Sequence, residues 1–208
     1  MTITNNRPLI FIHIGKCGGS TITNTLNNNN IKFNRVHVTC PQYQSDKKYL
    51  IAIRNPVERF VSAFCWRKFL VSRNHEPWQK DRFHGEYNFF QKFTTIESLM
   101  QSDITILEKQ YVHHIKEDIH FYLGDFVNQC DPTNVMGVVC TENLNKDLEN
   151  IFNIKNELHI NNNSKSKKKL KEEYREPLKK YLHKDYLVIE KLNNLKLLTR
   201  EQYEILSR

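Results

Sequence analysis

The first group of residues suited to chemistry in this chain is Lys16-Cys17-Gly18-Gly19-Ser20-Thr21. It follows an apolar run over residues 9–14, which predicts a buried strand, and it precedes a stretch expected to start a helix. A turn between a strand and a helix directs backbone N–H groups and the helix N-terminus at one point, where Lys16 adds a positive charge. This arrangement predicts a phosphate or sulfate site. The alternative is an ordinary tight turn in which the glycines only permit positive φ.

Arg54 ends a second apolar stretch and is a second candidate for anion binding. Asn55 has the type expected of a helix N-cap, and Glu58 would complete a capping box with it. Ser62 lies seven residues after Asn55, so it should sit two turns further along the same helix face. Arg54 and Ser62 are therefore predicted to hold a second anion, unless both are simply solvated.

Together, the two stretches resemble motifs of sulfotransferases that use PAPS (3′-phosphoadenosine 5′-phosphosulfate) as the sulfuryl donor. Residues 15–21, Gly-Lys-Cys-Gly-Gly-Ser-Thr, are similar to the loop that these enzymes wrap around the 5′-phosphosulfate. Residues 54–64, Arg-Asn-Pro-Val-Glu-Arg-Phe-Val-Ser-Ala-Phe, are similar to their 3′-phosphate motif. Gly15 replaces the proline that is usual in the first motif. The similarity is closest to the carbohydrate branch that contains heparan and dermatan sulfate 2-O-sulfotransferases.

The resemblance implies that the first motif binds the phosphosulfate and the second binds the 3′-phosphate. Lys16 would stabilise negative charge on the leaving phosphate, assisted by backbone N–H groups of the following turn. Ser164 and Lys165 lie in a polar loop where family members approach the nucleotide, so they would contact the 3′-phosphate or the adenine, unless this loop is a linker. The other residues expected to bind the donor are Cys17, Gly18, Gly19, Ser20, Thr21, Arg54 and Ser62.

A sulfotransferase also needs a base for the acceptor hydroxyl, and histidine as a residue type suits that task near neutral pH. The chain has nine histidines. His37 is the candidate, because residues 36–38 match the second half of a His-x-His-Val motif in the 2-O-sulfotransferase branch. Arg35 stands where that motif has its first histidine. His113 and His114 are the reserve candidates, and a purely structural His37 is the alternative.

The cysteines and the paired histidines bear on redox and metal chemistry. The five cysteines lack the spacing of a disulfide scaffold or a zinc finger, which predicts reduced thiols. Cys17 would sit at a helix N-terminus beside Lys16, so we expect its thiol to favour the thiolate. His113 and His114 are adjacent in a stretch expected to be helical over residues 106–115, where neighbours point to different faces. We therefore expect no metal.

Predicted strands alternate with predicted helices, which indicates an α/β fold with a parallel sheet flanked by helices. Anion sites in such folds lie beyond the carboxyl ends of the strands, where Gly15 and Arg54 are both expected. Thr141 is the expected cap of a helix over residues 142–152. The resemblance implies the sulfotransferase version of this architecture, which is P-loop-like. The predicted strands cover residues 9–14, 35–39, 48–54 and 134–140, and a helical C-terminal part covers residues 167–208.

Length and composition predict one globular domain over residues 1–208, with residues 1–7 as a frayed polar end. No stretch has the apolar length that a membrane span or a secretory signal needs, so we expect a cytoplasmic protein, with an excised lumenal domain as the alternative. The net charge of +8 suits an anionic nucleotide or an anionic polymer as a partner.

Two other functions fit parts of the sequence. A P-loop kinase or NTPase would need its lysine after the glycines and an aspartate for Mg²⁺, whereas Lys16 precedes Gly18 and Arg54 ends the second strand. A non-catalytic module for polyanions would use the positive charge and the aromatic residues between positions 66 and 100. That alternative leaves the spacing of the two anion motifs unexplained. We therefore expect PAPS-dependent transfer to a hydroxyl, most simply that of a glycan, without a nucleic-acid partner.

Overall fold

A sheet of four parallel strands, in the order β2-β1-β3-β4, forms the centre of the molecule. The computed structural model describes residues 7–73, 85–154 and 170–208. Five of the six residues of β3 are buried, as expected of an inner strand in a parallel sheet covered on both faces. The prediction of an α/β fold with a parallel sheet is confirmed. The strands are β1 (Leu9–His13), β2 (Asn34–Val36), β3 (Lys48–Ile53) and β4 (Val135–Cys140).

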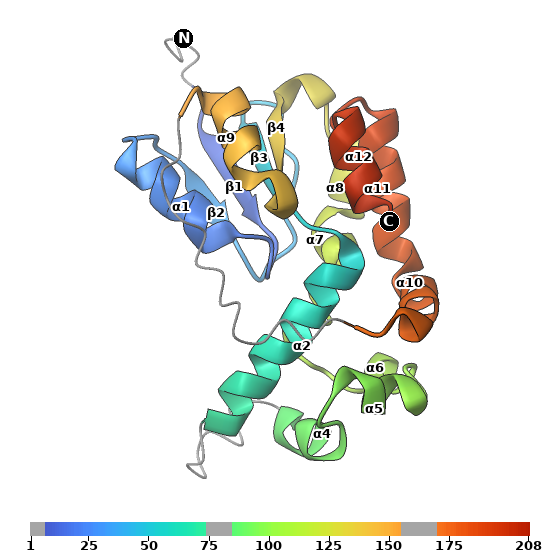
Figure 1. Ribbon diagram of the computed structural model, residues 1–208. Helices are drawn as coiled ribbons and strands as arrows, with labels where there is room; N and C mark the ends of the chain where they lie inside the picture. Colours follow the sequence, from blue (N-terminus) through green and yellow to red (C-terminus); the bar gives the residue numbers. More distant parts are fainter. Residues whose placement is uncertain (1–6, 74–84, 155–169) are drawn as a thin grey trace.

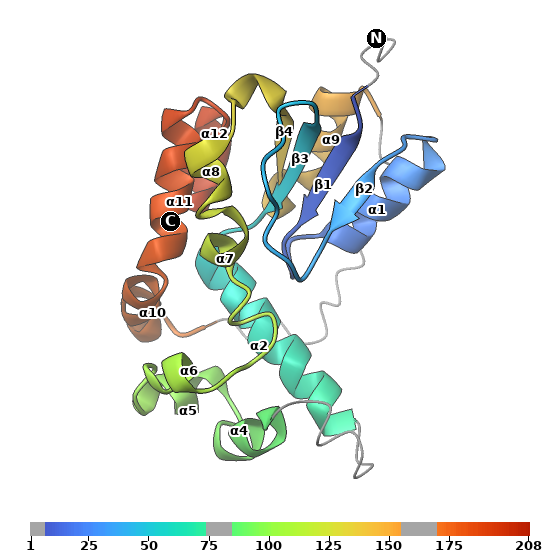
Figure 2. The same cartoon turned by 180° about the vertical axis from the view of Figure 1, so that it is seen from behind.

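Helices cover both faces of the sheet, and side chains from both layers join the strands in one apolar core. Burial of apolar surface contributes roughly 25 cal/mol per Å², so this core is the main favourable term that holds the layers together. One face carries α1 (Gly19–Asn28) and α9 (Leu144–Phe152), as Figure 1 shows. The opposite side, seen in Figure 2, carries α7 (Ile119–Leu123), α8 (Phe126–Gln129) and α11 (His183–Asn194).

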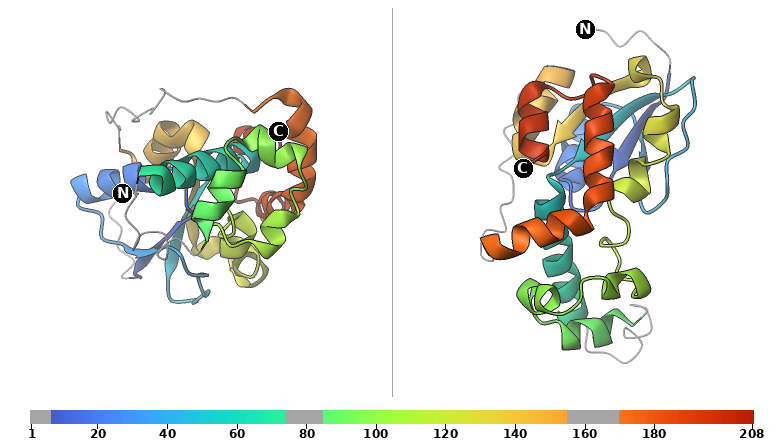
Figure 3. Two further views of the ribbon diagram at one scale, coloured as in Figure 1. Left: turned by 90° about the horizontal axis from the view of Figure 1, so that it is seen from below. Right: turned by 90° about the vertical axis from the view of Figure 1, so that its right-hand side faces the viewer.

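The long helix α2 (Pro56–Arg73) leaves the carboxyl edge of the sheet and enters a second, helical part of the molecule (Figure 3). Val57 and Phe60 near its start, and Phe64 further along, belong to a second apolar core in that part. None of the helices in the described ranges combines the length and the apolar character needed to cross a membrane. The helical part also contains α4 (Glu86–Lys92), α5 (Ile96–Gln101), α6 (Ile106–Lys109) and α10 (Arg175–Tyr181).

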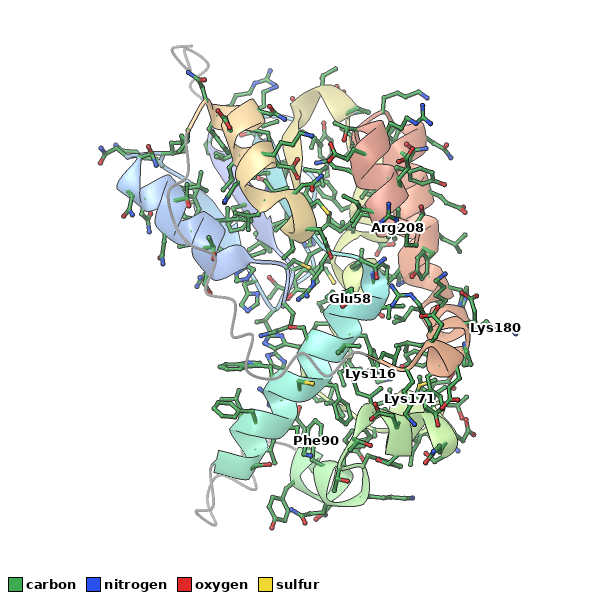
Figure 4. The ribbon with its side chains drawn as sticks, in the orientation of Figure 1. Glu58, Phe90, Lys116, Lys171, Lys180 and Arg208 are labelled. Carbon is green, nitrogen blue, oxygen red and sulfur yellow. The ribbon has the colours of Figure 1, made fainter. Side chains whose placement is uncertain are left out.

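The last helix, α12 (Arg200–Leu206), returns to the start of α2. The side-chain amide of Asn55 donates hydrogen bonds of 3.0 to 3.3 Å to the carbonyl oxygens of Ile205, Leu206 and Arg208. Figure 4 shows Arg208 close to Glu58, at the sheet end of α2. The C-terminal helix is thereby fixed to the segment that carries the second motif.

Two helices are shorter than the sequence predicts, because contacts with distant residues replace local ones. α6 ends at Lys109, and the following residues form a turn in which His114 has a φ of 62°. α9 begins at Leu144, after a short 3-10 turn over Thr141–Asn143. Thr141 does not cap this helix, since its hydroxyl donates instead to the carbonyl oxygen of Ile53 at 3.0 Å.

Candidate functional site

The loop after β1 turns sharply between Gly15 and Gly18 and leads directly into α1. Lys16 has a φ of 71° and Gly18 a φ of 72°, so both adopt the left-handed conformation. Gly18 is the N-cap of α1, and a glycine has no side chain that could occupy the helix N-terminus. A Cβ atom at this position would lie 2.8 Å from Cδ1 of Leu144, so a larger residue would also disturb the packing of α9. No side chain caps the first turn of α1, which is the condition that the predicted anion site requires.

The two predicted motifs meet at the carboxyl edge of the sheet. β1 and β3 are neighbours, and the chain passes from β1 outward to β2 before it returns on the other side as β3. Ligands of open α/β sheets bind at such a switch point. Nη1 of Arg54 donates to the carbonyl oxygen of Lys16 at 3.4 Å. The structure thus brings these two residues together from positions 38 residues apart in the sequence.

The edge of the sheet concentrates positive charge. Burial and the neighbouring Arg54 guanidinium lower the pKa of Lys16. Nζ of Lys16 lies 4.6 Å from the centroid of the Trp66 ring, which supplies a cation–π contact. Glu142 offsets part of the charge, since its Oε1 lies 3.7 Å from Nε of Arg54. An anion bound between the two cations would reduce their mutual repulsion.

Ser62 lies on α2, one helical turn before Trp66. Residues four apart share a face of a helix, so Ser62 is on the face whose Trp66 ring contacts Lys16. Its side chain is half-buried. Ser164 and Lys165, the other candidates for contact with the nucleotide, lie outside the described residues.

Asn55 caps α2 as predicted, but the prediction that Glu58 completes a capping box with it is wrong. Oδ1 of Asn55 accepts a hydrogen bond from the Glu58 N–H at 3.2 Å, as expected of an N-cap. The Asn55 N–H donates to Glu142 at 3.3 Å rather than to Glu58. Glu58 instead lies 3.4 Å from Arg175 in an ion pair. A carboxylate from a distant segment therefore replaces the local partner.

Arg59 is a site residue to which sequence reasoning assigned no role. It is fully buried, and its Nη1 donates to the carbonyl oxygens of His114 at 2.8 Å, Glu117 at 3.3 Å and Gly15 at 3.4 Å. The sequence feature that could have indicated a role for Arg59 is its spacing of four residues from Asn55, which places it on the capped side of α2. Arg59 ties the loop after β1 to the turn that carries His114.

His37 directly follows β2 and lies against His13. Its Nδ1 is 2.8 Å from the carbonyl oxygen of His13, and the two rings stack with centroids 4.3 Å apart. Because a carbonyl oxygen only accepts hydrogen bonds, Nδ1 must carry a proton, and in the neutral form of the ring Nε2 is then the acceptor. An imidazole held in this tautomer has the lone pair that a general base requires.

His114 adds a second imidazole at the same edge. Its ring centroid lies 5.8 Å from that of His37. A Cβ atom at residue 15 would lie 2.5 Å from Nδ1 of His114, so the ring occupies the space that a side chain at Gly15 would need. Burial, together with the charge of neighbouring histidines, lowers the pKa of both His114 and His13 to about 3. Both rings are therefore neutral at pH 7, and His114 is a weak candidate for the base.

The prediction of a thiolate at Cys17 was wrong. The side chain is fully buried, and burial raises the pKa of its thiol to about 12. Its Sγ lies 3.9 Å from the carbonyl oxygen of Gly15, inside the turn. Cys17 can therefore serve an anion only through its backbone, and its side chain fills the core beneath the loop.

The turn after α6 gathers three potential metal ligands, whose ligand atoms lie within 4.8 Å of one another: His113, His114 and Glu117. The expectation that adjacent histidines would point apart on a helix was wrong, since this segment is a turn. The Glu117 carboxylate already accepts hydrogen bonds from the Tyr111 hydroxyl, the His114 N–H and Nδ1 of His113. Burial acts to raise the pKa of Glu117, but these bonds lower it to about 2. The cluster is internally hydrogen-bonded, and the absence of a metal cofactor stays a prediction.

Comparisons with protein-family models, with curated proteins and with solved structures found no match for this chain. The residues at the carboxyl edge of the sheet must therefore carry the functional argument.

Proposed function

We propose that this protein is a sulfotransferase that moves the sulfuryl group of PAPS to a hydroxyl, most simply one of a carbohydrate. The observation that carries the proposal is the contact of 3.4 Å between Arg54 and the backbone of Lys16. This contact supports the proposal, because it joins the two turns that resemble the 5′- and 3′-phosphate motifs, and a single nucleotide would have to contact both. The parallel sheet agrees with this proposal, which includes the P-loop-like sulfotransferase fold.

The residues at the edge of the sheet fit such a donor. The uncapped first turn of α1 and the Lys16 ammonium would hold the phosphosulfate, because backbone N–H groups and a lysine both favour phosphate-like oxygens. Arg54 would hold the 3′-phosphate, with the Ser62 hydroxyl as a further donor. The flexible stem of Lys16 lets its ammonium move from Trp66 to the bound anion.

His37 and Lys16 would each carry out one part of the transfer reaction. The donor supplies an activated sulfuryl group joined to a phosphate. Nε2 of His37 accepts the proton of the acceptor hydroxyl while the hydroxyl oxygen forms its bond to sulfur. The bond from sulfur to the bridging phosphate oxygen breaks, and Lys16 stabilises the electron pair left on that oxygen. The carbonyl oxygen of His13 keeps Nδ1 of His37 protonated and also stabilises the ring once it becomes charged.

A transfer assay tests the proposal directly. The purified protein is incubated in EDTA with PAPS labelled in the sulfuryl group and with separate pools of glycans, lipids and small phenols. We expect label in a glycan product from the wild type and strongly reduced label from the variant His37→Ala. A parallel reaction contains Mg²⁺ and γ-labelled ATP in place of EDTA and PAPS, and transfer of phosphate in that reaction would favour the kinase alternative instead.

A further inference from the structure

Val38, the residue after His37, has a backbone conformation that its own side chain disfavours. Its φ is 69°, in the left-handed region that β-branched residues rarely adopt. The side chain is 42% exposed, so tight packing of the valine does not explain the conformation. Strained residues persist where surrounding contacts hold them, and they cluster at functional sites. A contact from elsewhere in the fold must therefore hold Val38 in this conformation.

The hydroxyl of Tyr122 makes that contact. It accepts a hydrogen bond from the Val38 N–H at 2.9 Å. Tyr122 belongs to α7, is only 1% exposed and is packed in the core beneath the sheet, so its hydroxyl has a fixed position. A second contact anchors the same segment to α7, since Sγ of Cys40 donates to the carbonyl oxygen of Phe121 at 3.1 Å. The chain after His37 is thus attached to a rigid element.

We propose that Tyr122 is a positioning residue for His37, a role that depends on the proposed function. His37 is held from two sides: its Nδ1 by the carbonyl oxygen of His13, and its following peptide by the Tyr122 hydroxyl. Without the hydroxyl, Val38 relaxes to negative φ, and the rotation is transmitted to the residue before it. The His37 ring then leaves the His13 carbonyl, and Nε2 loses its defined direction. A misplacement of about 1 Å at a catalytic group can reduce a rate by about 100-fold.

The variant Tyr122→Phe tests this role against a matched control, Tyr49→Phe. Tyr49 is also 1% exposed, and its hydroxyl also accepts a backbone hydrogen bond, from the Gln44 N–H at 2.7 Å. It lies at the start of β3, at the opposite edge of the sheet from His37. We expect Tyr122→Phe to lower kcat at least tenfold with unchanged affinity for PAP, the desulfated donor. Tyr49→Phe should leave kcat within twofold of the wild type.

A direct measurement on His37 separates positioning from activity. Nitrogen-15 NMR of the imidazoles should show His37 protonated at Nδ1 in the wild type and in Tyr49→Phe, and a mixture of tautomers in Tyr122→Phe. If the wild type neither binds PAP nor transfers sulfate, the proposed function fails, yet this spectrum still tests the contact. If Tyr122→Phe changes neither the His37 signal nor kcat, the inference is overturned.

A rescue variant shows whether the strain at Val38 is the link. Glycine adopts positive φ freely, so the double variant Tyr122→Phe, Val38→Gly should recover most of the lost kcat and the Nδ1-protonated signal. If Tyr122→Phe does not fold, Val38→Pro replaces it in the same measurements. Proline fixes φ near −65° and removes the N–H donor at an exposed position, so it should reproduce the loss. Wild-type values in Val38→Pro would contradict the role of Tyr122.

Discussion

The carboxyl edge of the sheet contains two regions that differ in charge and in origin. The anion region, residues 15–21 and Arg54, follows two neighbouring strands, and burial together with the nearby Arg54 guanidinium lowers the pKa of Lys16. The histidine region comprises His13, His37 and His114, which come from three separate segments. Burial keeps two of these three rings neutral, with a pKa of about 3. The first region is rich in positive charge, whereas the second is rich in imidazole groups, of which the proposed function uses His37 as the base.

Because the two regions differ in this way, substitutions should affect the affinity for PAP and kcat separately. Under the proposed function, charge in the anion region acts on both the donor and the leaving group, so its loss should weaken the affinity for PAP and lower kcat. Under the same proposal His37 acts only on the acceptor proton, so its loss should lower kcat alone. The regions are joined by Arg59, which donates to carbonyl oxygens of both Gly15 and His114. Substitutions within one region should therefore keep the two effects separate, whereas substitutions at this junction should not.

The largest effect is expected from Lys16→Ala. Loss of one preorganised charge at the leaving group should lower kcat by about 10³-fold, and the affinity for PAP should fall as well. Initial rates with labelled PAPS and calorimetric titration with PAP measure the two effects. Lys146→Ala, at an exposed lysine, is the control and should behave as the wild type. A Lys16→Ala enzyme with normal kcat would remove this residue from the chemistry.

His37→Ala should have the next largest effect. Loss of a general base lowers rates by about 10² to 10⁴, and the lower value is expected here because water can replace the imidazole in part. The affinity for PAP should remain that of the wild type, in contrast to Lys16→Ala. His113→Ala serves as the comparison, since Nδ1 of His113 is engaged with Glu117 at 2.8 Å. If His37→Ala leaves the rate unchanged and His113→Ala lowers it, His113 and not His37 is the base.

Gly15→Ala tests the junction between the two regions. The added methyl group would lie 2.5 Å from Nδ1 of His114, so either the loop or the ring must shift. Overpacking of this kind costs about 1 to 3 kcal/mol in the free energy of unfolding, which urea denaturation measures. The double variant Gly15→Ala, His114→Ala should recover part of the loss, because the two residues are in contact. Strictly additive effects would show that the ring does not confine residue 15.

The smallest effect concerns pH. The pKa of His114 is lowered to about 3 in the folded state, against 6.5 in the unfolded chain, mainly by burial. Between these values the unfolded state binds more protons than the folded state, so stability falls as the pH falls below 6.5. The slope from this residue is at most about 1.4 kcal/mol per pH unit. His114→Gln should flatten the loss of stability between pH 7 and 5, which urea denaturation at each pH measures. Parallel curves for wild type and His114→Gln would contradict the buried neutral ring.

The anion region was predictable from the sequence because its features are local. Apolar runs predict β1 and β3, the glycines predict the turn, and the parallel sheet then requires Gly15 and Arg54 to leave the same edge. The histidine region was only partly predictable. His37 was named from a motif, but its tautomer depends on the carbonyl oxygen of a residue 24 positions away.

Other features of the site depend on tertiary contacts that no local pattern records. Periodicity predicts a helix through His114, but Arg59 binds the carbonyl oxygen of His114 in a turn. A helix N-terminus predicts a reactive Cys17, yet the core buries its thiol. In both cases tertiary packing outweighs a local effect, which is helix propensity in the first case and the helix dipole in the second. Each such effect is worth a few tenths to about 1 kcal/mol.

Calorimetric titration with PAP in EDTA tests the proposed function most directly, because sulfuryl transfer from PAPS requires one nucleotide to bridge Lys16 and Arg54. We predict one PAP per chain, with at least tenfold weaker binding to Arg54→Ala. Adenosine 5′-monophosphate, which lacks the 3′-phosphate, should bind the wild type and Arg54→Ala equally weakly. Absence of PAP binding, or binding that neither Lys16→Ala nor Arg54→Ala weakens, would contradict the account.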